Sequence, residues 1–250
     1  MSPIQRFTKR GIDIVGSLIG LIVSFPVIVI AAALAQREFG KSGIFQQERV
    51  GLNGRLFMIY KIRTMRDLPG HTTSVTTVRD PRLTPLGRWL RHCKIDELPQ
   101  FFNVLIGDMS LVGPRPDVTE IMCDLNDEDR VILSVRPGLT GPAAVSYPDE
   151  ERLLANVADP DRFNREVLFP RKVTLNRKYI AEYRLWHDFI YIWKTVFGNG
   201  DHVELRSISD LSADSRYRIA DEFHLDEYEE HKIAVCVAMA DTTSDESCKP

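Results

Sequence analysis

The N-terminal part of this chain contains the feature that most restricts how it can fold. From Ile12 to Ala35 the sequence is almost continuously apolar, and the interruptions are Asp13, a few glycines and serines, and Pro26. These 24 residues would measure about 36 Å as a helix, enough to cross the roughly 30 Å hydrocarbon core of a bilayer. The fold therefore has to accommodate one helix that lipid can surround.

Three interpretations fit this apolar segment. A cleaved signal peptide would have its basic start at Lys9 and Arg10, and residues 33–35 (Ala-Leu-Ala) resemble a cleavage site. Asp13 and the great length of the segment disagree with a signal peptide. A simple membrane-spanning anchor would be one straight helix. A re-entrant helix hairpin would enter and leave the membrane on the same side.

The pattern slightly favours the re-entrant hairpin. Pro26 lacks a backbone donor and clashes with the preceding turn, so it should break the helix, and Ser24 is placed to satisfy some of the freed backbone groups. Basic residues flank both ends of the segment, at Arg6, Lys9, Arg10, Arg37 and Lys41. Since positive charge marks cytoplasmic flanks, both ends should lie on the cytoplasmic face.

Charge is distributed unevenly along the rest of the chain. Residues 49–115 contain 11 Lys and Arg against 5 Asp and Glu, whereas residues 201–250 contain 5 against 13. The basic middle predicts an anionic partner such as a phosphate ligand or anionic lipid. Nucleic acid fits poorly, because the basic stretch lacks interleaved aromatic residues. The four cysteines are scattered without metal-ligand or disulfide spacing, which fits a reduced cytoplasmic setting.

The remaining pattern predicts an α+β fold that is mainly helical. Residues 44–65 contain two β-rich runs around Gly51-Leu52-Asn53-Gly54, which predicts a small β-hairpin. We expect further helices over residues 86–98, 117–134, 149–168 and 170–197. The first of them should end or kink at Pro99.

The last predicted helix carries a stripe of large side chains, at Trp186, Phe189, Ile190, Trp193 and Phe197. Their spacing places them on one helical face. The stripe fits either a helix that faces the protein core or an amphipathic helix that lies in a membrane interface.

Asp96 and Glu97 are the first candidates for chemistry. Adjacent carboxylates on a helix are most often solvated, but this pair lies between a largely apolar helix and a second apolar stretch. Three cations precede the pair, at Arg88, Arg91 and Lys94, and one follows it, at Arg115. Arg115 stands in a stiff Pro-Arg-Pro frame that orients its guanidinium for phosphate. Carboxylates among cations suit phosphoryl transfer, in which one carboxylate can attack phosphorus.

Lys61 and Arg63 supply two more cations at the end of the predicted hairpin. Alternation along a strand would place both on the same face, although a solvated edge strand is the simpler interpretation. The sequence contains no glycine-rich phosphate loop of the Walker or Rossmann type. Bound phosphates would therefore be held by cationic side chains.

Five linked motifs follow one another along the chain: YKIRTM at 60–65, GRWLR at 87–91, IDELPQ at 95–100, NVLIGDMSLVGPRP at 103–116 and RPGLTG at 136–141. Together they closely resemble the bacterial sugar transferase family, the monotopic polyprenyl-phosphate phosphoglycosyl transferases. The resemblance runs from about residue 5 to residue 198 and is specific, because the motifs occur in the family's order.

The resemblance implies a phosphoglycosyl transferase. Asp96 would attack the β-phosphate of a UDP-sugar and expel UMP, and undecaprenyl phosphate would then accept the phosphosugar, starting a membrane-linked glycan such as an exopolysaccharide. Glu97 would assist, and Mg²⁺ would be held near Asp96 and Glu97. The expected phosphate-binding residues are Lys61, Arg63, Arg88, Arg91 and Arg115.

The resemblance also implies a place in the cell. A re-entrant membrane helix broken at Ser24 and Pro26, with amphipathic helices on the cytoplasmic leaflet, would make the protein monotopic on the bacterial inner membrane. The expected organisation is a membrane helix over 1–40, a catalytic domain over 41–198 and an acidic extension of unassigned role over 199–250.

Two points qualify the resemblance. Pro142-Ala143-Ala144 follow Thr140-Gly141, where the family often continues Leu-Ala-Gln, so the substrate-facing loop can differ locally. The sugar, the glycan and the oligomeric state, a homodimer included, are left open. A non-catalytic module that holds anionic lipid would explain the apolar segment and the basic middle, but it gives Asp96 and Glu97 no role.

Overall fold

The computed structural model describes residues 1–70, 73 and 75–198, so the predicted acidic extension over 199–250 lies outside the described residues. In chain order the elements are α1 (Pro3–Phe39), β1 (Ile44–Val50), η1 (Leu52–Gly54), β2 (Leu56–Ile62), α2 (Pro85–His92), η2 (Ile95–Glu97), α3 (Gln100–Ile106), β3 (Ser110–Val112), α4 (Thr119–Met122), η3 (Asp129–Ser134), β4 (Gly138–Thr140), α5 (Pro142–Ser146), α6 (Glu150–Leu154), α7 (Pro160–Phe163), η4 (Asn164–Leu168), α8 (Phe169–Ala181) and α9 (Leu185–Phe197). Within the described residues, helices predominate and the strands form two small sheets, which confirms the mainly helical α+β prediction.

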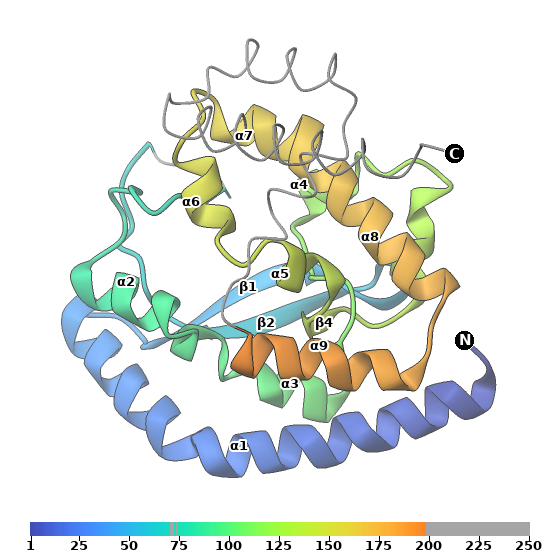
Figure 1. Cartoon of the computed structure of the whole chain (residues 1–250). Coiled ribbons are helices and arrows are strands. Elements are labelled where there is room, and N and C mark those ends of the chain that lie inside the picture. Colours follow the sequence, from blue (N-terminus) through green and yellow to red (C-terminus); the bar gives the residue numbers. More distant parts are fainter. Residues whose placement is uncertain (71–72, 74, 199–250) are drawn as a thin grey trace, which may run out of the picture.

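The elements are arranged around the β1–β2 hairpin (Figure 1). Helix α1 runs along the base, with α3 and α9 beside it, while α6, α7 and α8 lie on the other side of the hairpin. An apolar cluster that contains Ala31, Ala35, Ile62 and Leu90 joins α1 to β2 and α2. The long apolar helix is therefore packed directly against the elements that contain the 60–65 and 87–91 motifs.

Helix α1 is one continuous helix of 37 residues. It begins with a capping box in which the Ser2 side chain accepts from the Gln5 backbone N–H, and it ends at Gly40, whose φ of 64° is left-handed. Pro26 lies inside it, and the Ser24 hydroxyl donates to the Gly20 carbonyl at 2.6 Å. Such back-bonding bends helices, and Figure 1 shows α1 curving upward toward α2.

The expected break at Ser24 and Pro26 is therefore accommodated by a bend within one helix and not by two helices joined by a turn. The helix is long and apolar enough to cross a membrane, with a mean hydropathy of 2.7 in its most apolar window. Entry and exit on the same side of a membrane stays a prediction.

Helix α1 has its polar side chains inside and its apolar side chains outside. Asp13, Ser17 and Ser24 are buried, whereas Phe25 and Val23 are among many large apolar residues that are exposed. A helix of a water-soluble domain has the opposite arrangement. The exposed apolar face of α1 therefore indicates association with a membrane.

Two glycines let α1 approach its neighbours closely. A Cβ at Gly16 would lie 2.6 Å from the Leu111 side chain, and a Cβ at Gly20 would lie 2.8 Å from the Phe101 ring. Both distances are far below van der Waals contact, so a larger residue at either position would force the Leu111 or Phe101 side chain to move. The buried Asp13 uses this proximity, because it accepts hydrogen bonds from the Ser110 hydroxyl and the Leu111 backbone.

The predicted β-hairpin is confirmed. Strands β1 and β2 pair antiparallel from Ile44 opposite Ile62 to Val50 opposite Leu56. The turn between them is the Gly51–Gly54 segment named from the sequence, and it includes left-handed Asn53 with a φ of 55°. Asn tolerates this conformation better than most residues, which explains why the turn could be recognised.

The helices beyond the hairpin are shorter than predicted. The segment 117–134 contains α4 and η3 with an irregular stretch between them, and 149–197 is divided among five elements. The parallel pairing of β3 with β4, in which Ser110 lies opposite Gly138, was not predicted. It joins two of the recognised motifs, because it pairs the segment before Arg115 with the 136–141 segment.

Helix α9 settles the interpretation of the aromatic stripe. Trp186 and Trp193 are 70% and 65% exposed, and Phe189 and Phe197 are also exposed. The buried residue of this helix is Asp188. The core-facing interpretation is therefore wrong, and the stripe lies on the surface as the interfacial interpretation requires. Figure 1 places α9 on the same side of the domain as α1.

Candidate active site

Lys94 ends one helix and starts the turn that presents the two candidate carboxylates. Its φ of 54° is left-handed, a conformation that an α-helix cannot contain. Helix α2 therefore ends at His92, and Asp96 and Glu97 lie in the 3₁₀ turn η2. The prediction of one helix that continues to Pro99 is wrong, and the shorter helix leaves both carboxylates at a corner between α2 and α3.

Asn103 fixes this corner to the hairpin. Its side chain is fully buried, its Oδ1 accepts from the Tyr60 backbone N–H at 3.1 Å, and its Nδ2 donates to the Met58 carbonyl at 2.7 Å. These bonds hold α3 along strand β2. They thereby place Lys61, the residue after Tyr60, beside Glu97.

Glu97 is clamped by two cations from different parts of the chain. Its Oε1 accepts from Lys61 Nζ at 3.3 Å and from an Arg115 guanidinium nitrogen at 2.5 Å. Burial alone would raise the pKa of Glu97, but Arg115 and Lys61 outweigh it and hold the pKa well below the usual range. Glu97 is therefore an anion fixed in place.

Asp96 is the opposite kind of carboxylate. It is 5% exposed, and its nearest cation is Arg91, whose Nε lies 4.0 Å from Oδ2, too far for a hydrogen bond. Burial, and then the charge of Glu97, raise the pKa of Asp96 from 3.8 to about 6. At neutral pH the carboxylate is still largely ionised and weakly held, which is the state that a nucleophile requires.

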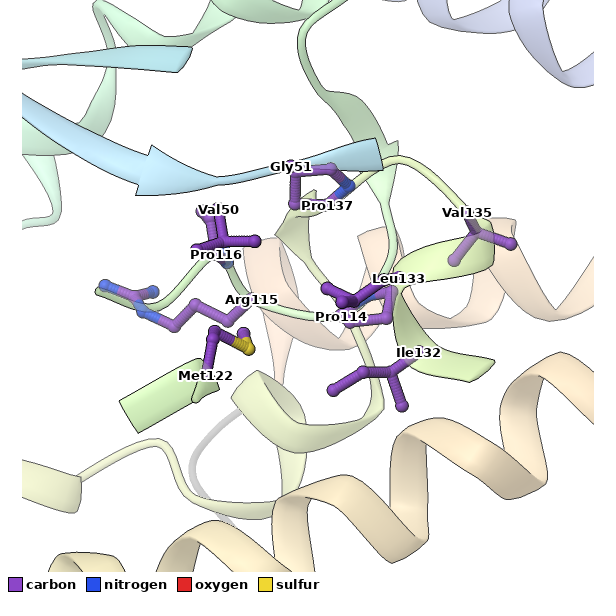
Figure 2. Close-up of a pocket in the computed structure, with 10 residues that line it drawn as sticks. All are labelled: Val50, Gly51, Pro114, Arg115, Pro116, Met122, Ile132, Leu133, Val135 and Pro137. Carbon is purple, nitrogen blue, oxygen red and sulfur yellow. The ribbon is translucent and has the colours of Figure 1, made fainter. Parts of the chain in front are cut away.

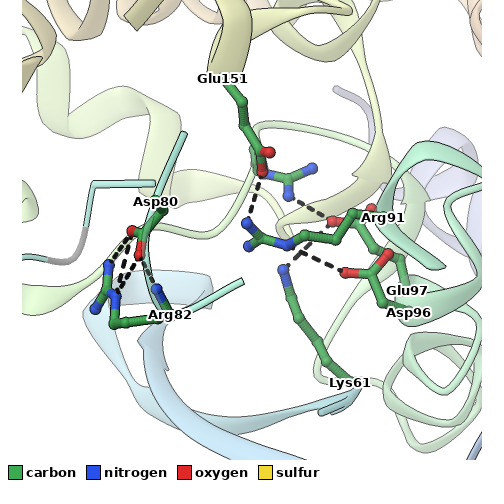
Figure 3. A network of polar contacts seen from close by, with 8 residues as sticks. Lys61, Asp80, Arg82, Arg91, Asp96, Glu97 and Glu151 are labelled. Atoms are coloured by element: carbon green, nitrogen blue, oxygen red, sulfur yellow. Dashed lines mark hydrogen bonds and ion pairs between the residues drawn. The ribbon is translucent and has the colours of Figure 1, made fainter. Parts of the chain in front are cut away.

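Arg91 is shared between Asp96 and a residue of helix α6. Its NH1 lies 2.9 Å from Glu151 Oε1, and Figure 3 shows the guanidinium between Glu151 and the two candidate carboxylates. Burial raises the pKa of Glu151, although Arg91 opposes this effect. The structure thus brings together three carboxylates and three cations from β2, α2, η2, α6 and the loop after β3.

The family of the chain follows from its similarity to known proteins. A profile of the bacterial sugar transferase family matches residues 4–199. The chain belongs to this family. This confirms the family predicted from the motifs.

Individual relatives of this bacterial sugar transferase are named for related activities. Galactosyl transferase CpsE of Streptococcus agalactiae serotype III is 37% identical over 200 residues, which are 75% of this chain and 41% of that protein. The UDP-N-acetylgalactosamine-undecaprenyl-phosphate N-acetylgalactosaminephosphotransferase of Aeromonas hydrophila is 36% identical over 199 residues, covering 78% and 44% of the two proteins. The exopolysaccharide production protein ExoY of Rhizobium meliloti is 30% identical over 211 residues, covering 78% and 86%. The chain thus spans less than half the length of the first two relatives.

Two predicted phosphate ligands lie apart from the cluster. Arg63 donates through Nε to the Ser42 carbonyl at 3.0 Å and stacks over the Phe45 ring. Arg63 directly follows the end of β2, and Phe45, over which it stacks, lies opposite Lys61 in the hairpin. Arg88 is exposed on α2. A role for Arg63 or Arg88 in phosphate binding stays a prediction.

Three residues that position the site were missed from the sequence. Asn103 lay within a recognised motif but was given no role, and the left-handed conformation of Lys94 has no signal in its residue type. Glu151 follows Glu150 at the start of a short helix, where acidic residues are common because they favour the helix dipole. Nothing local distinguishes it from an ordinary surface residue.

A small cavity lies beside Arg115. It is lined by Pro114, Arg115, Pro116 and neighbouring apolar residues, and Figure 2 shows the Arg115 side chain extending from its edge. Its volume of about 10 Å³ has room for roughly one water molecule. This space is too small for a sugar or a nucleobase.

The chemistry of the two carboxylates fits a magnesium ion. Within the described residues no three His, Cys, Asp or Glu side chains gather as a metal cluster. Mg²⁺ does not need one, because it often binds through one or two carboxylates together with waters and substrate phosphates. Lys61 and Arg115 both bind Oε1 of Glu97, which leaves Oε2 and the Asp96 oxygens as donors.

Proposed function

We propose that the chain transfers a phosphosugar from a UDP-sugar to undecaprenyl phosphate through a covalent intermediate on Asp96. An oxygen of the Asp96 carboxylate attacks the β-phosphorus, the bond to the bridging oxygen breaks, and UMP leaves with that electron pair. A phosphate oxygen of the lipid then attacks the same phosphorus and releases Asp96. The names of relatives, which specify undecaprenyl phosphate and sugar phosphotransfer, support this acceptor and reaction class.

The contrast between the two adjacent carboxylates carries the proposal. Glu97 is held by two cations, whereas Asp96 is buried and has no hydrogen bond to its carboxylate among the described residues. Two neighbouring acids whose surroundings shift their pKa values apart typically have different roles in catalysis. Asp96 attacks phosphorus, and Glu97 holds Lys61 and Arg115 in place for the pyrophosphate.

Magnesium would be held by Asp96 and Glu97 together with the donor phosphates, and would supply positive charge against them. The cationic side chains of the protein would also offset the negative charge of the phosphates. Lys61, Arg91 and Arg115 surround the place where negative charge moves from the attacking carboxylate to the departing UMP.

The deciding experiment mixes the purified protein with a UDP-sugar and Mg²⁺ in the absence of lipid acceptor. We expect UMP to appear at once in an amount limited by the enzyme, and intact mass spectrometry to detect one phosphosugar adduct. If UMP release required undecaprenyl phosphate, transfer would be direct and the covalent route would be refuted.

Arg115→Lys should lower the rate of UMP release although it keeps the positive charge. Lysine cannot reproduce the guanidinium fork that contacts Glu97 and suits a phosphate. Losing one charge-assisted hydrogen bond corresponds to roughly a 10- to 100-fold fall. Arg130→Lys is the matched control, because Arg130 is exposed on η3 with a long ion pair to Asp127. Near wild-type activity in Arg115→Lys would remove this residue from the phosphate site.

We further propose that the protein is monotopic on the cytoplasmic face of the bacterial inner membrane. Thr8 and Ser42 are exposed on either side of the apolar part of α1. Single cysteines at these positions in a cysteine-free protein should both resist a membrane-impermeant maleimide in spheroplasts and react after permeabilisation. Labelling of Thr8→Cys from outside would show that α1 spans the membrane.

A further inference from the structure

Glu151 of helix α6 forms an ion pair with Arg91 of helix α2. Glu151 Oε1 lies 2.9 Å from Arg91 NH1, while the nearest Asp96 oxygen lies 4.0 Å from Arg91 Nε. One guanidinium therefore stands between two carboxylates and is closer to the one that the family motifs do not contain. Figure 3 shows this order from Glu151 through Arg91 to Asp96.

The 4.0 Å distance between Arg91 Nε and Asp96 Oδ2 is important if Asp96 is the nucleophile. Arginine and carboxylate side chains that are free to pair come to about 2.7–2.9 Å and often form two parallel hydrogen bonds. Such a pair would cover the oxygens with which Asp96 has to attack. Among the described residues Arg91 has no third carboxylate within 4.0 Å besides Glu151 and Asp96, so without Glu151 it would turn to Asp96.

The backbone holds Glu151 in place independently of its side chain. Its carbonyl accepts from the Val78 backbone N–H at 3.2 Å. Leu153 and Leu154 of the same helix are buried in an apolar cluster with Phe163. The Glu151 carboxylate is therefore presented from a fixed element, and its replacement by an amide of the same shape leaves these anchors intact.

We propose that Glu151 is a positioning residue that keeps Arg91 oriented beside Asp96 without letting it pair with the nucleophile, an inference that rests on the proposed function. Arg91 is then available to the donor pyrophosphate, and the Asp96 oxygens stay open to phosphorus. Glu151 acts through Arg91 and does not touch the reacting atoms.

The test is a double-mutant cycle measured on the first half-reaction. The rate of adduct formation at saturating UDP-sugar, without lipid acceptor, is compared for wild type, Glu151→Gln, Arg91→Ala and the double variant. We expect Glu151→Gln to lower the limiting rate about 10-fold in the wild-type background. In the Arg91→Ala background, where no guanidinium can cover Asp96, the same change should alter the rate less than about 2-fold.

Arg152→Gln is the matched control on the same helix, because Arg152 is 70% exposed and forms a long ion pair with Asp149. The rate of Arg152→Gln should equal that of wild type.

Equal effects of Glu151→Gln in both backgrounds would overturn the inference, since Glu151 would then act on the substrate or on the fold. A wild-type protein that forms no adduct would instead refute the proposed function. An unchanged thermal unfolding midpoint of Glu151→Gln separates positioning from misfolding.

Discussion

Asp96→Asn should abolish formation of the phosphosugar adduct. The amide keeps the size of the side chain but is a far poorer nucleophile than the carboxylate, so the covalent route is lost. A loss of about 4 kcal/mol or more in transition-state stabilisation corresponds to at least a roughly 10³-fold fall in rate. The measurement is intact mass after incubation with UDP-sugar and Mg²⁺, together with the amount of UMP released.

The same substitution should make the protein more stable, which excludes misfolding as the reason for inactivity. The pKa of Asp96 in the folded protein, about 6, lies above the ordinary value of 3.8, so the ionised form is disfavoured by folding. This cost is fully present above about pH 6 and disappears as the pH falls toward the unfolded value. On the order of 2–3 kcal/mol should be gained by Asp96→Asn at about pH 7.5 without divalent metal, and little at about pH 4.

Glu97→Gln provides the comparison at the neighbouring position. It removes the anion that holds Lys61 and Arg115, so it should slow the reaction, but it leaves the attacking group in place. A weak adduct in Glu97→Gln and none in Asp96→Asn would identify the nucleophile. An adduct that persists in Asp96→Asn would show that Asp96 is a metal ligand or base in a direct transfer.

Asp188→Ala should strongly destabilise the protein, although Asp188 is not one of the candidate active-site residues around Asp96 and Glu97. Asp188 accepts from Lys9 Nζ at 2.6 Å and from the Tyr179 and Tyr183 hydroxyls at 2.7 and 3.1 Å. The side chains of Lys9 and Asp188 are 12% and 8% exposed. Removing one partner of a buried ion pair leaves the other charge without compensation and costs about 3–5 kcal/mol.

The loss should appear as a lower thermal unfolding midpoint in detergent or nanodiscs. Asp127→Asn is the matched control, because Asp127 is fully exposed and its ion pair with Arg130 is 3.8 Å long; its midpoint should change little. The double variant Lys9→Met with Asp188→Leu removes both charges and should recover part of the stability, because the buried Tyr179 and Tyr183 hydroxyls still lose their acceptor. A midpoint of Asp188→Ala equal to that of the control would mean that the pair does not hold α1 against α9.

The parts of the fold that could be predicted are those with a local signal. The β-hairpin follows from two β-rich runs around Gly51-Leu52-Asn53-Gly54, and the apolar segment of α1 follows from its composition. The early end of α2 could not be predicted, because lysine is an ordinary helix-forming residue and only tertiary packing holds Lys94 in a left-handed conformation. Periodicity placed Trp186 and Trp193 on one face of α9, but it cannot tell whether that face meets protein or lipid.

The candidate site was recognised through its motifs and not through its geometry. Asp96, Glu97 and Arg115 lie in segments whose composition suggested phosphate chemistry, and the structure brings Lys61 and Arg91 to them. Glu151 could not be found in this way, since it is 55 residues from Asp96 in the sequence and belongs to none of the motifs. Contacts between distant segments depend on the fold as a whole.

The polar inner face of α1 has a consequence for the order in which the protein is made. Lys9 and Asp13 are synthesised long before their partners: Ser110 is 97 residues behind Asp13, and Asp188 is 179 residues behind Lys9. At typical bacterial synthesis speeds the second interval lasts on the order of ten to forty seconds. During that time the polar face of α1 lacks the partners that cover it in the folded protein. Synthesis of α1 and its docking are therefore separate events, and a ribosome stalled before residue 188 should leave α1 accessible to a protease that the finished protein resists.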